Sequence, residues 1–411
     1  MMRAEVLIVG AGPAGIAAAV RATGEGRKVS ILDDNPRIGG QIWRGASGSP
    51  DWFAALARSG ADVITGVRVI GADARARTLR VESAREAFDV RYEELILATG
   101  AREWQLPFPG WTLPNVMSAG GLQAMVKSGL PVRGKRVVVA GSGPLLLAVA
   151  AYLRSRGATV PLIAEQTEWG RLARFSAELL REPGKLWQAV TLGAPSYSPG
   201  TWVIAAEGEQ AVSRVVVRRA TRTWRVDCDY AAIGFGLRPN TELAELLGCR
   251  VEGRSVWVDE LQFTSVDGVW CAGEACGIGG VDLAIVEGEI AGYGASGNRE
   301  AARRLFAIRQ NGWRFAGAMR QAFALRDELR EMAKPDTIVC RCEDVTLGTL
   351  EAARDWRSAK LHTRCGMGPC QGRVCGPALE FLKGWKVESV RPPVFPARIG
   401  SLLSQEEEET R

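Results

Sequence analysis

The chain has 411 residues, of which 46% are hydrophobic and 24% charged, so it is long enough for more than one globular domain. The net charge of +6 is modest and spread along the chain, with an acidic run at 406–409, which argues against a nucleic-acid-binding surface. No apolar stretch approaches the roughly 20 residues of a membrane span. The N-terminal apolar run leads into a glycine motif rather than a cleavage site. We therefore expect the nine cysteines in the reducing cytoplasm, with a peripheral position at the inner membrane left open.

The first glycine motif follows an apolar strand predicted at residues 5–9 and precedes an alanine-rich helix predicted to end near Gly24. In a G-x-G-x-x-G turn, the first glycine makes the tight turn, the second lets the backbone approach a pyrophosphate, and the third lets helix and strand pack closely. The helix N-terminus adds N–H groups that bind phosphate. The candidate nucleotide contacts are Gly10, Ala11, Gly12, Pro13, Ala14 and Gly15.

A second predicted strand, at residues 28–32, ends at Asp33 and Asp34, where an acid is expected to meet the ribose hydroxyls. Strand, turn, helix, strand and acid together predict a dinucleotide pocket far more specifically than the glycines alone. The pattern does not say which nucleotide the pocket binds.

Two later segments resemble motifs of two-dinucleotide flavoproteins. One is a strand at 92–97 that leads into an A-T-G turn, and the other is a strand at 269–271 that leads into a Gly-Glu pair. In that superfamily the first fingerprint holds FAD, the A-T-G turn closes the FAD domain, and a late G-D pair meets the ribityl chain; here a glutamate replaces the aspartate. The candidate contacts are Thr99, Gly100, Gly273 and Glu274, together with Gly40 and Gln41 of a Gly-Gly-Gln turn that matches the superfamily's turn near the flavin.

A second strand–turn–helix unit is predicted at residues 136–156, with its glycine turn at 141–146. Leu146 takes the third glycine position, where it is expected to hold the helix away from the strand or to fill the space of a nucleotide backbone. The acid candidate, Glu165, comes one residue later than the spacing from Gly10 to Asp33. Two interpretations stay open, a purely structural fold and a working NADH site.

Residues 299–333 are predicted to be helical, with apolar side chains at i+3 and i+4 spacing that indicate a packing surface. Pro335 is expected to end this segment. The segment separates the flavoprotein-like part of the chain from a cysteine-rich module.

Five of the nine cysteines lie between residues 340 and 375, as C-x-C, a gap, and then C-x4-C spacing, whereas the first 227 residues contain none. Thiols gathered in this way indicate a soft-metal site. Four thiolates from two short loops can hold a [2Fe-2S] cluster. Structural zinc is the alternative, although zinc sites usually use C-x2-4-C in both halves.

The module resembles bacterioferritin-associated-ferredoxin-like domains, and this resemblance implies four iron ligands: Cys340, Cys342, Cys370 and Cys375. Cys365 stands where related modules commonly have a non-ligand. The single histidine, His362, cannot supply a histidine-based triad or a multi-histidine metal site. No cysteine lies near the first glycine turn, which argues against thiol–disulfide exchange beside a flavin, and no catalytic residue is predicted.

With these residues in place, the chain resembles the alpha subunit of bacterial heteromeric flavin-dependent dehydrogenases and oxidases of amino acids and opines. That group includes hydrogen cyanide synthase, proline and hydroxyproline dehydrogenases and opine oxidases, and it is related to heterotetrameric sarcosine oxidase. The most specific matches are residues 141–147 and 363–373. The resemblance implies an electron relay: a beta subunit with its own FAD oxidises a C–N bond, and this chain passes the electrons through flavin and [2Fe-2S] to a quinone or other acceptor.

The same resemblance implies FAD or another adenine nucleotide at the first turn, FMN at a subunit interface as in some relatives, and, as a further partner, a small ferredoxin-like gamma subunit. Two other functions stay open. One is a self-sufficient NAD(P)H-dependent reductase that uses the second glycine turn. The other is a non-catalytic scaffold whose nucleotide and metal only stabilise it.

The predicted fold is an α/β two-dinucleotide-binding-domain flavoprotein, Rossmann-like and glutathione-reductase-like, with a small α-helical C-terminal [2Fe-2S] domain. The predicted domains are a first FAD-type half at 1–118, an inserted second Rossmann-like domain at 119–225, a second FAD-type half at 226–298, a helical linker at 299–335, a [2Fe-2S] domain at 336–400 and an acidic tail at 401–411.

Overall fold

The structure, a computed structural model, describes residues 2–44, 49–179, 196–387 and 389–403 and contains two compact units. The first unit comprises the described parts of Met1–Arg102, Arg238–Ala316 and Ser389–Arg411, and the second those of Glu103–Leu237 and Gly317–Glu388. Each unit contains one glycine turn, and the second also contains the five clustered cysteines. The finer division into domains stays a prediction, and the acidic run at 406–409 lies outside the described residues.

A seven-stranded sheet forms the centre of the first unit, in the order β3-β2-β1-β6-β5-β4, with β19 also paired to β6. β1 is parallel to β2 and β6, and its residues 6–8 are fully buried, as expected for a parallel strand covered on both faces. The predicted strands at 5–9, 28–32, 92–97 and 269–271 are confirmed. The strands are β1 (Met2–Val9), β2 (Val29–Asp33), β3 (Asp62–Thr65), β4 (Arg68–Asp73), β5 (Thr78–Glu82), β6 (Ala87–Leu97) and β19 (Val269–Cys271).

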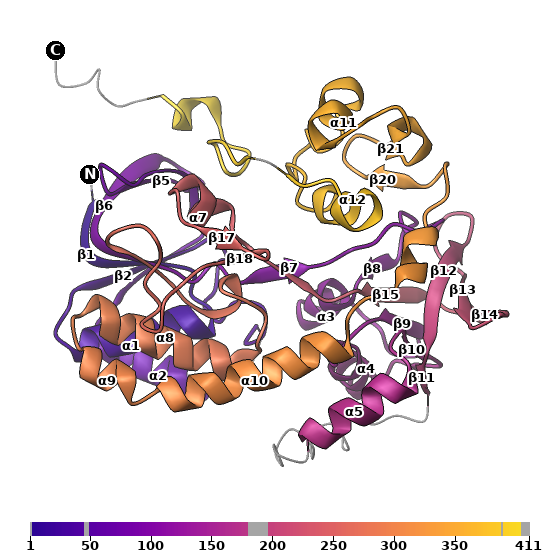
Figure 1. Ribbon diagram of the computed structural model, residues 1–411, viewed down its shortest axis with the longest axis horizontal. Helices are drawn as coiled ribbons and strands as arrows, with labels where there is room; N and C mark the ends of the chain where they lie inside the picture. Colours follow the sequence, from indigo (N-terminus) through magenta and orange to yellow (C-terminus); the bar gives the residue numbers. More distant parts are fainter. Residues whose placement is uncertain (1, 45–48, 180–195, 388, 404–411) are drawn as a thin grey trace. The chain divides into compact units, whose positions relative to one another are not determined.

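Small residues let two helices of the first unit, α1 (Pro13–Gly24) and α8 (Val281–Ala295), pack side by side (Figure 1). A Cβ atom at Gly288 would come within 2.1 Å of the Ala14 carbonyl oxygen, so a larger side chain there would push the helices apart. The other described elements of this unit are α2 (Pro50–Ser59), α7 (Glu242–Leu246), β17 (Val251–Glu252), β18 (Ser255–Val256), η1 (Gly273–Ala275), α9 (Arg299–Arg303) and η4 (Ile399–Ser401).

The second unit has a parallel five-stranded sheet in the order β11-β10-β9-β15-β8 and an antiparallel three-stranded sheet, β12-β13-β14. The predicted strand and helix around the second glycine turn are confirmed as β9 and α4. Its elements are β8 (Val116–Ser118), α3 (Ala119–Lys127), β9 (Val137–Gly141), α4 (Leu145–Ser155), β10 (Ile163–Glu165), α5 (Trp169–Leu179), β11 (Tyr197–Pro199), β12 (Thr201–Glu207), β13 (Arg214–Arg219), β14 (Arg222–Asp227) and β15 (Tyr230–Gly234). The chain passes between the units at β7 (Ala101–Glu103) and β16 (Leu237–Pro239).

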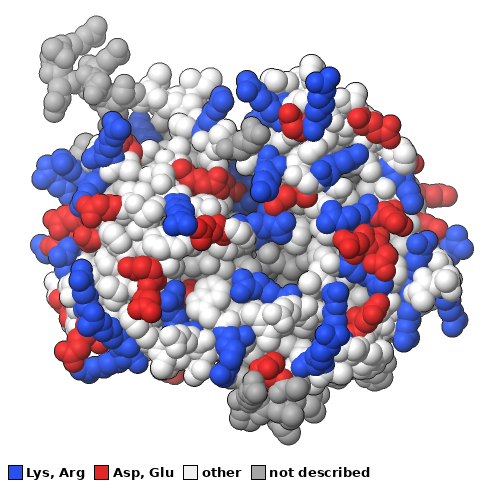
Figure 2. Space-filling view, viewed as in Figure 1, with Lys and Arg blue, Asp and Glu red and all other residues white. Residues whose placement is uncertain are grey.

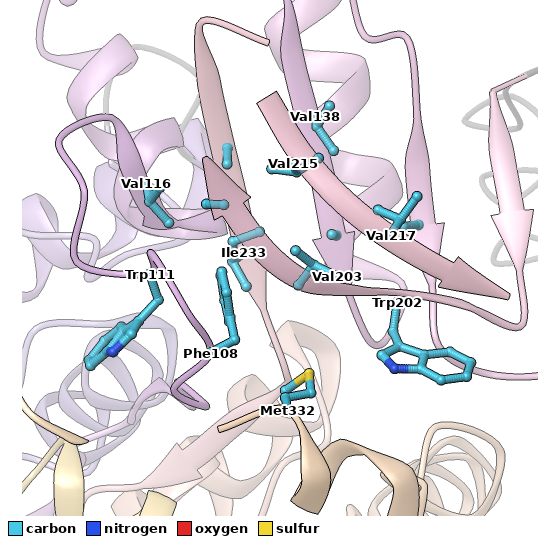
Figure 3. Packing of buried hydrophobic residues seen from close by; sticks show 14 of the residues in the cluster. Phe108, Trp111, Val116, Val138, Trp202, Val203, Val215, Val217, Ile233 and Met332 are labelled. Atoms are coloured by element: carbon cyan, nitrogen blue, oxygen red, sulfur yellow. The ribbon is translucent and has the colours of Figure 1, made fainter. Parts of the chain in front are cut away.

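A buried core joins the two sheets of the second unit, as Figure 3 shows. The parallel sheet contributes Val138 and Ile233, and the antiparallel sheet contributes valines that face them. Phe108 and Trp111, from the segment before β8, complete the core together with Met332. This packing places the segment before β8 next to the cysteine-rich module.

The cysteine-rich module is mostly helical, with one short hairpin. It comprises β20 (Ile338–Cys340), β21 (Val345–Thr346), η3 (Gly348–Leu350), α11 (Trp356–Thr363) and α12 (Cys375–Lys383). Its own small core surrounds Trp356 and includes Cys340, Cys365 and Cys375. The Trp111 indole N–H donates to the Ile338 carbonyl oxygen at 2.6 Å and ties the module to the rest of the second unit.

The predicted helical segment at 299–333 is interrupted. After α9, helix α10 (Phe306–Ala322) ends, residues 323–326 are not helical, and η2 (Asp327–Glu331) follows. The interruption matters because the carbonyl groups of residues 323 and 324 accept hydrogen bonds from residues near the second glycine turn. Ile308, predicted to pack, is 55% exposed.

Among the described residues, no helix combines the length and the apolar character needed to cross a bilayer. On the face drawn in Figure 2, basic and acidic side chains are interspersed rather than segregated by sign.

Candidate functional site

The first glycine turn has the tight packing that a dinucleotide fingerprint requires. Gly10 has a φ of +107°, which favours glycine. A Cβ atom at Gly15 would lie 1.8 Å from the Gly10 carbonyl oxygen, so only glycine fits there. The Ile16 N–H donates to the Gly12 carbonyl oxygen at 2.9 Å, which begins α1 directly after the turn. The N-terminus of α1 therefore lies where a pyrophosphate is expected.

The two candidate acids differ in exposure. Asp33 is 6% exposed and accepts hydrogen bonds from the Ala11 N–H at 2.6 Å and the Asn35 N–H at 2.7 Å. Asp34 is exposed, and one of its carboxylate oxygens lies 3.9 Å from the Arg68 guanidinium. Asp33 is thus held at the end of β2 against the turn, whereas Asp34 points into solvent.

The Gly-Gly-Gln turn lies against the first glycine turn. The Gly39 N–H donates to the Ala11 carbonyl oxygen at 2.7 Å, and a Cβ atom at Gly40 would meet the Gly12 Cα at 3.1 Å. Gln41 is exposed. The structure therefore brings Gly40 to the candidate nucleotide contacts, while the Gln41 side chain is free to meet a ligand.

The A-T-G turn is held by a neighbour that sequence reasoning did not identify. The Thr99 hydroxyl donates to the Asn240 carbonyl oxygen at 2.8 Å, and the Asn240 amide donates to the Thr99 carbonyl oxygen at 2.8 Å. Gly100 adopts a φ of +66°. Asn240 follows β16, so the turn is fixed by a segment far away in the sequence.

Glu287 is a buried acid that the sequence analysis missed. It lies on α8 with no exposed surface and accepts from the Gly273 N–H at 3.0 Å and the Trp313 indole N–H at 2.9 Å. Burial raises its pKa to about 7. Burial also raises the pKa of the neighbouring Glu274. The available signal was an acid flanked by small and apolar residues within α8, which also contains Asp282 and Glu289.

The second glycine turn keeps the glycine geometry but not the packing of the first. Gly141 has a φ of +139°, and a Cβ atom there would lie 1.7 Å from the Gly234 carbonyl oxygen. Leu146 is fully buried, and its N–H donates to the Gly143 carbonyl oxygen at 3.1 Å, a three-residue turn where the first unit has a four-residue one. Leu146 packs in the buried core of this unit, and its predicted effect on nucleotide binding stays a prediction.

Glu165 points inward rather than toward a ligand. It has no exposed surface and accepts from the Gly143 N–H at 2.8 Å and the Thr167 N–H at 2.9 Å. Burial raises its pKa to about 7. The carboxylate thus accepts the hydrogen bond of one N–H group of the turn, which is then not available to a phosphate.

The interrupted linker covers the polar groups beside this second turn. The Ser142 hydroxyl donates to the Phe323 carbonyl oxygen at 3.1 Å. Gln166 donates to the Ala324 carbonyl oxygen at 3.3 Å and accepts from the Arg326 N–H at 3.1 Å. Ser142 and Gln166 are 4% and 1% exposed. The chain's own backbone therefore satisfies groups that an incoming nucleotide would need.

The five clustered cysteines converge in space. The Sγ atoms of Cys340, Cys365 and Cys375 all lie within 4.8 Å of one another. Cys370 interacts with Cys375 and with Cys342, which joins all five thiols in one cluster. The structure thus brings the four predicted ligands together and adds Cys365, predicted to be a non-ligand, to the same cluster.

The local backbone suits metal-bound sulfur. The Gly366 N–H donates to the Cys340 Sγ at 3.4 Å, and the contact with Cys365 is the main cause that holds the Cys340 pKa below its usual range. A Cβ atom at Gly368 would lie 2.3 Å from the Cys342 Cβ. Metal ligation requires thiolates, and backbone N–H groups turned toward sulfur stabilise them.

The predicted ligands also share a cavity. A cavity of about 270 Å³ is lined by Cys340, Cys342, Cys370 and Cys375, together with aromatic and aliphatic side chains. Cys365 has no exposed surface and is absent from the lining. This difference separates the four predicted ligands from the fifth thiol.

The other four cysteines, Cys228, Cys249, Cys271 and Cys276, are buried, and three of them lie near one another. The Cys276 thiol contacts that of Cys271, and Cys249 lies near Cys271. Burial raises the pKa of the Cys249 thiol to about 11. The Cys249 thiol is therefore a poor nucleophile.

Comparison with known proteins decides the family. The model of the pyridine nucleotide-disulphide oxidoreductases matches residues 4–288. The chain belongs to this family. It is therefore an oxidoreductase with the FAD/NAD-binding, Rossmann-like fold, which confirms that part of the predicted fold and activity.

Among curated relatives, this oxidoreductase is 33% identical to hydrogen cyanide synthase subunit HcnB of Pseudomonas aeruginosa over 91% of each chain. It is 31% identical to an opine oxidase subunit of Rhizobium meliloti, over 97% of this chain and 98% of that protein. Both relatives are components of multi-subunit enzymes. The coarse resemblance inferred from the motifs is confirmed.

Solved structures agree on the fold. The crystal structure of L-proline dehydrogenase from P. horikoshii matches with a TM-score of 0.70 at 18% identity, over 98% of this chain and 80% of that one. Lactococcus lactis thioredoxin reductase matches with a TM-score of 0.55 at 18% identity, over 74% of this chain and 99% of that one. At these identities the likeness concerns the fold alone.

Proposed function

We propose that this chain is the electron-relay subunit of a heteromeric flavin-dependent dehydrogenase or oxidase of an amino acid, imino acid or opine. A partner beta subunit oxidises the C–N bond, and this chain passes the electrons to a quinone or other acceptor. The observation that carries the proposal is the cluster of thiols in which Cys340, Cys342, Cys370 and Cys375 face one cavity.

The relatives support the class of reaction and the partner. Their names describe subunits of a hydrogen cyanide synthase and of an opine oxidase, and the fold neighbour is an L-proline dehydrogenase. All three names concern small nitrogen compounds. These names fit a relay chain that works beside an FAD-dependent beta subunit, with a further partner in the form of a small ferredoxin-like gamma subunit.

The residues of the first turn fit FAD or another adenine nucleotide. Gly12 leaves room for the pyrophosphate, while Gly10 and Gly15 allow the close packing of the turn. Asp33 accepts a hydrogen bond from the Ala11 N–H, and Glu287 accepts one from the Gly273 N–H of the late turn. When bound, a flavin accepts two electrons and releases them singly, which matches a one-electron [2Fe-2S] carrier.

The cysteine module fits a [2Fe-2S] cluster held by Cys340, Cys342, Cys370 and Cys375. These residues supply four soft donors from two loops, and the Gly366 N–H faces sulfur. Structural zinc is the chemical rival for the same thiols. Cys365 is the remaining neighbour and takes no part in ligation under this proposal.

A self-sufficient NAD(P)H-dependent reductase is the second candidate, because the matched family model spans the second glycine turn. Three features argue against this candidate. Leu146 is a buried side chain at the third glycine position, the Glu165 carboxylate accepts from the Gly143 N–H, and the linker backbone accepts from the Ser142 hydroxyl. A scaffold role is the third candidate, and it would leave the thiol cluster without a redox task.

The composition of the purified protein tests the proposal. The chain would be purified alone and with its co-encoded beta subunit, and flavin, adenine nucleotide, iron, acid-labile sulfide and zinc would be measured. We expect about two irons and two sulfides per chain, with flavin retained best in the complex. Zinc without sulfide, and no flavin in either preparation, would leave only the scaffold.

Serine substitutions test the ligand set. We expect Cys370→Ser to abolish the visible absorption of the cluster, because it removes one of four ligands. Cys365→Ser is the matched control, since it changes an equally clustered thiol that does not line the cavity. The opposite result would reassign the fourth ligand to Cys365.

A further inference from the structure

The thiol-lined cavity extends beyond the sulfur atoms. Besides the four cysteines, its walls are aromatic and aliphatic, from Phe108, Trp111, Val116, Met117, Ile233 and Val374. Trp111 is 6% exposed and anchored by its indole N–H to Ile338, so this wall is rigid. Figure 3 shows Phe108, Trp111, Val116 and Ile233 on neighbouring segments of the same unit. A flat apolar ring would lose little entropy on entering such a preformed slot.

A second cavity, of about 400 Å³, adjoins the first and shares four lining residues with it: Val116, Met117, Ser118 and Arg341. Its other walls combine the aliphatic side chains of Leu113, Met125 and Leu130 with the polar groups of Asn115 and Tyr230. Met125 is 47% exposed, so this second cavity reaches the surface. The two cavities together offer a mostly apolar inner chamber and a larger outer one with an aliphatic side.

Among the side chains that line the inner chamber, one cation and one amide can serve as hydrogen-bond donors to a ligand. Arg341 is the one cationic side chain among the residues that line either cavity, and no ion pair to it is found among the described residues. Gln105 supplies an amide in the inner chamber. One cation and one amide suit the two carbonyl oxygens of a quinone. They do not suit a nucleotide phosphate, which usually needs several N–H or cationic donors.

We propose that the two cavities form the acceptor site of this chain and bind an isoprenoid quinone, with the ring against Trp111 and the cysteines and the tail along Leu113 and Leu130. The inference rests on the proposed function, which it deepens by naming the acceptor. Conversion of the quinone to its quinol takes two electrons and two protons. A [2Fe-2S] cluster held by the four cysteines would supply these electrons one at a time from the flavin of the complex, and water would supply the protons.

Arg341 lines the same cavity as Cys340 and Cys342, so its charge would face a ring bound there. A cation near the ring favours electron transfer onto it, because the added negative charge is stabilised where the surroundings exclude water. Removal of this charge is therefore expected to weaken acceptance of electrons more than binding of the neutral ring.

The test uses the full chain with measured iron and sulfide. The probe is a decyl-substituted benzoquinone. Its binding to the oxidised chain is measured by equilibrium dialysis. Its reoxidation of the reduced, desalted chain is followed by visible absorbance. Met117→Trp fills the region shared by both cavities and should weaken binding and slow reoxidation by at least about ten-fold. Leu361→Trp, at a 68% exposed position outside the cavity lining, should leave both within about two-fold.

Arg341→Gln provides the second variant, because its exposed side chain can be changed without loss of packing. Reoxidation slower than in the parent chain with nearly unchanged binding supports the site. Binding that Met117→Trp leaves unchanged, or competition by FMN at equal concentration, overturns it. If Met117→Trp loses iron, the Arg341→Gln result decides. Absence of iron and sulfide from the parent chain is a distinct failure, that of the proposed function itself.

Discussion

The two glycine turns share most of their sequence pattern but differ in what surrounds them. At the first turn, Gly15 lets the helix begin directly after the turn, and Asp33 braces the end of the neighbouring strand. At the second, Leu146 replaces that glycine, and Glu165 reaches the Gly143 N–H. A glycine fingerprint therefore identifies a strand–turn–helix, and under our proposal nucleotide binding also requires a glycine at the third position and N–H groups of the turn that no side chain already bonds.

The linker adds to this contrast. Backbone carbonyl groups of the segment after α10 accept hydrogen bonds from Ser142 and Gln166. These polar side chains beside the second turn therefore already have partners within the chain. The Arg326 guanidinium lies 4.1 Å from the centre of the Trp202 ring, which further holds the segment. The residues beside the second turn thus hold the segment that leads to the cysteine module.

The largest expected effect comes from the third position of the turn. Gly15→Val should lower the free energy of unfolding by at least about 3 kcal/mol and abolish bound nucleotide, because a Cβ atom there overlaps the Gly10 carbonyl oxygen. Leu146→Val, the matched change in the second unit, should cost only about 1 kcal/mol and leave the nucleotide content unchanged. Urea unfolding and analysis of the heat-released nucleotide measure both. Loss of bound nucleotide in Leu146→Val would show that the second turn also contributes to nucleotide binding.

The next effect concerns the buried acid of the second turn. The pKa of Glu165 is about 7 in the folded chain and lies near 4.5 when the chain is unfolded. The folded state therefore holds the proton of Glu165 more tightly, so the contribution of this group to stability is greatest below pH 4.5, falls as the pH rises to about 7, and is then constant. Glu165→Gln should remove this contribution, roughly 1 to 3 kcal/mol, and leave that of Glu287, whose pKa is also raised to about 7.

Glu209→Gln, at an exposed position, is the control for this titration. Unfolding by urea at pH values from 5 to 8 would compare the three chains. A Glu165→Gln chain whose stability changes with pH by the same slope as that of the parent chain would show that burial does not raise the pKa of Glu165.

The smallest effect concerns the linker. Gln166→Ala should cost about 1 to 2 kcal/mol, because it removes the acceptor for the Arg326 N–H and a donor to the Ala324 carbonyl group. Hydrogen exchange should become faster at residue 326 and stay unchanged in β9. Equal exchange rates at residue 326 in the two chains would mean that the linker is held by other contacts.

Local features of this chain were predictable, and contacts between distant segments were not. The β1–α1–β2 unit and its acid could be predicted because the apolar run, the glycines and Asp33 lie within one stretch of about thirty residues. The break at residues 323–326 could not, since it depends on bonds to Ser142, 181 residues away in the sequence. Helix-forming periodicity continues through the break, and tertiary hydrogen bonds override it.

The thiol cluster shows the same limit. The spacing of the cysteines predicted a metal module, but it could not place Cys365 in the cluster. Trp356 fills the space beside Gly366 and Gly372, and this packing positions the loop that carries Cys365. Glu287 could not be predicted because α8 contains three acids, and no local motif separates the buried one from the others.

The central claim is that electrons reach this chain from a partner protein of the complex and not from NAD(P)H at the second turn. Anaerobic stopped-flow mixing of the complete complex tests it, once with NADH and once with the amino acid, imino acid or opine that the complex oxidises, while flavin and iron–sulfur absorbance are followed. We expect the substrate to bleach both centres and NADH to bleach neither. Fast flavin bleaching by NADH, or centres that stay oxidised while substrate is consumed, would contradict the claim.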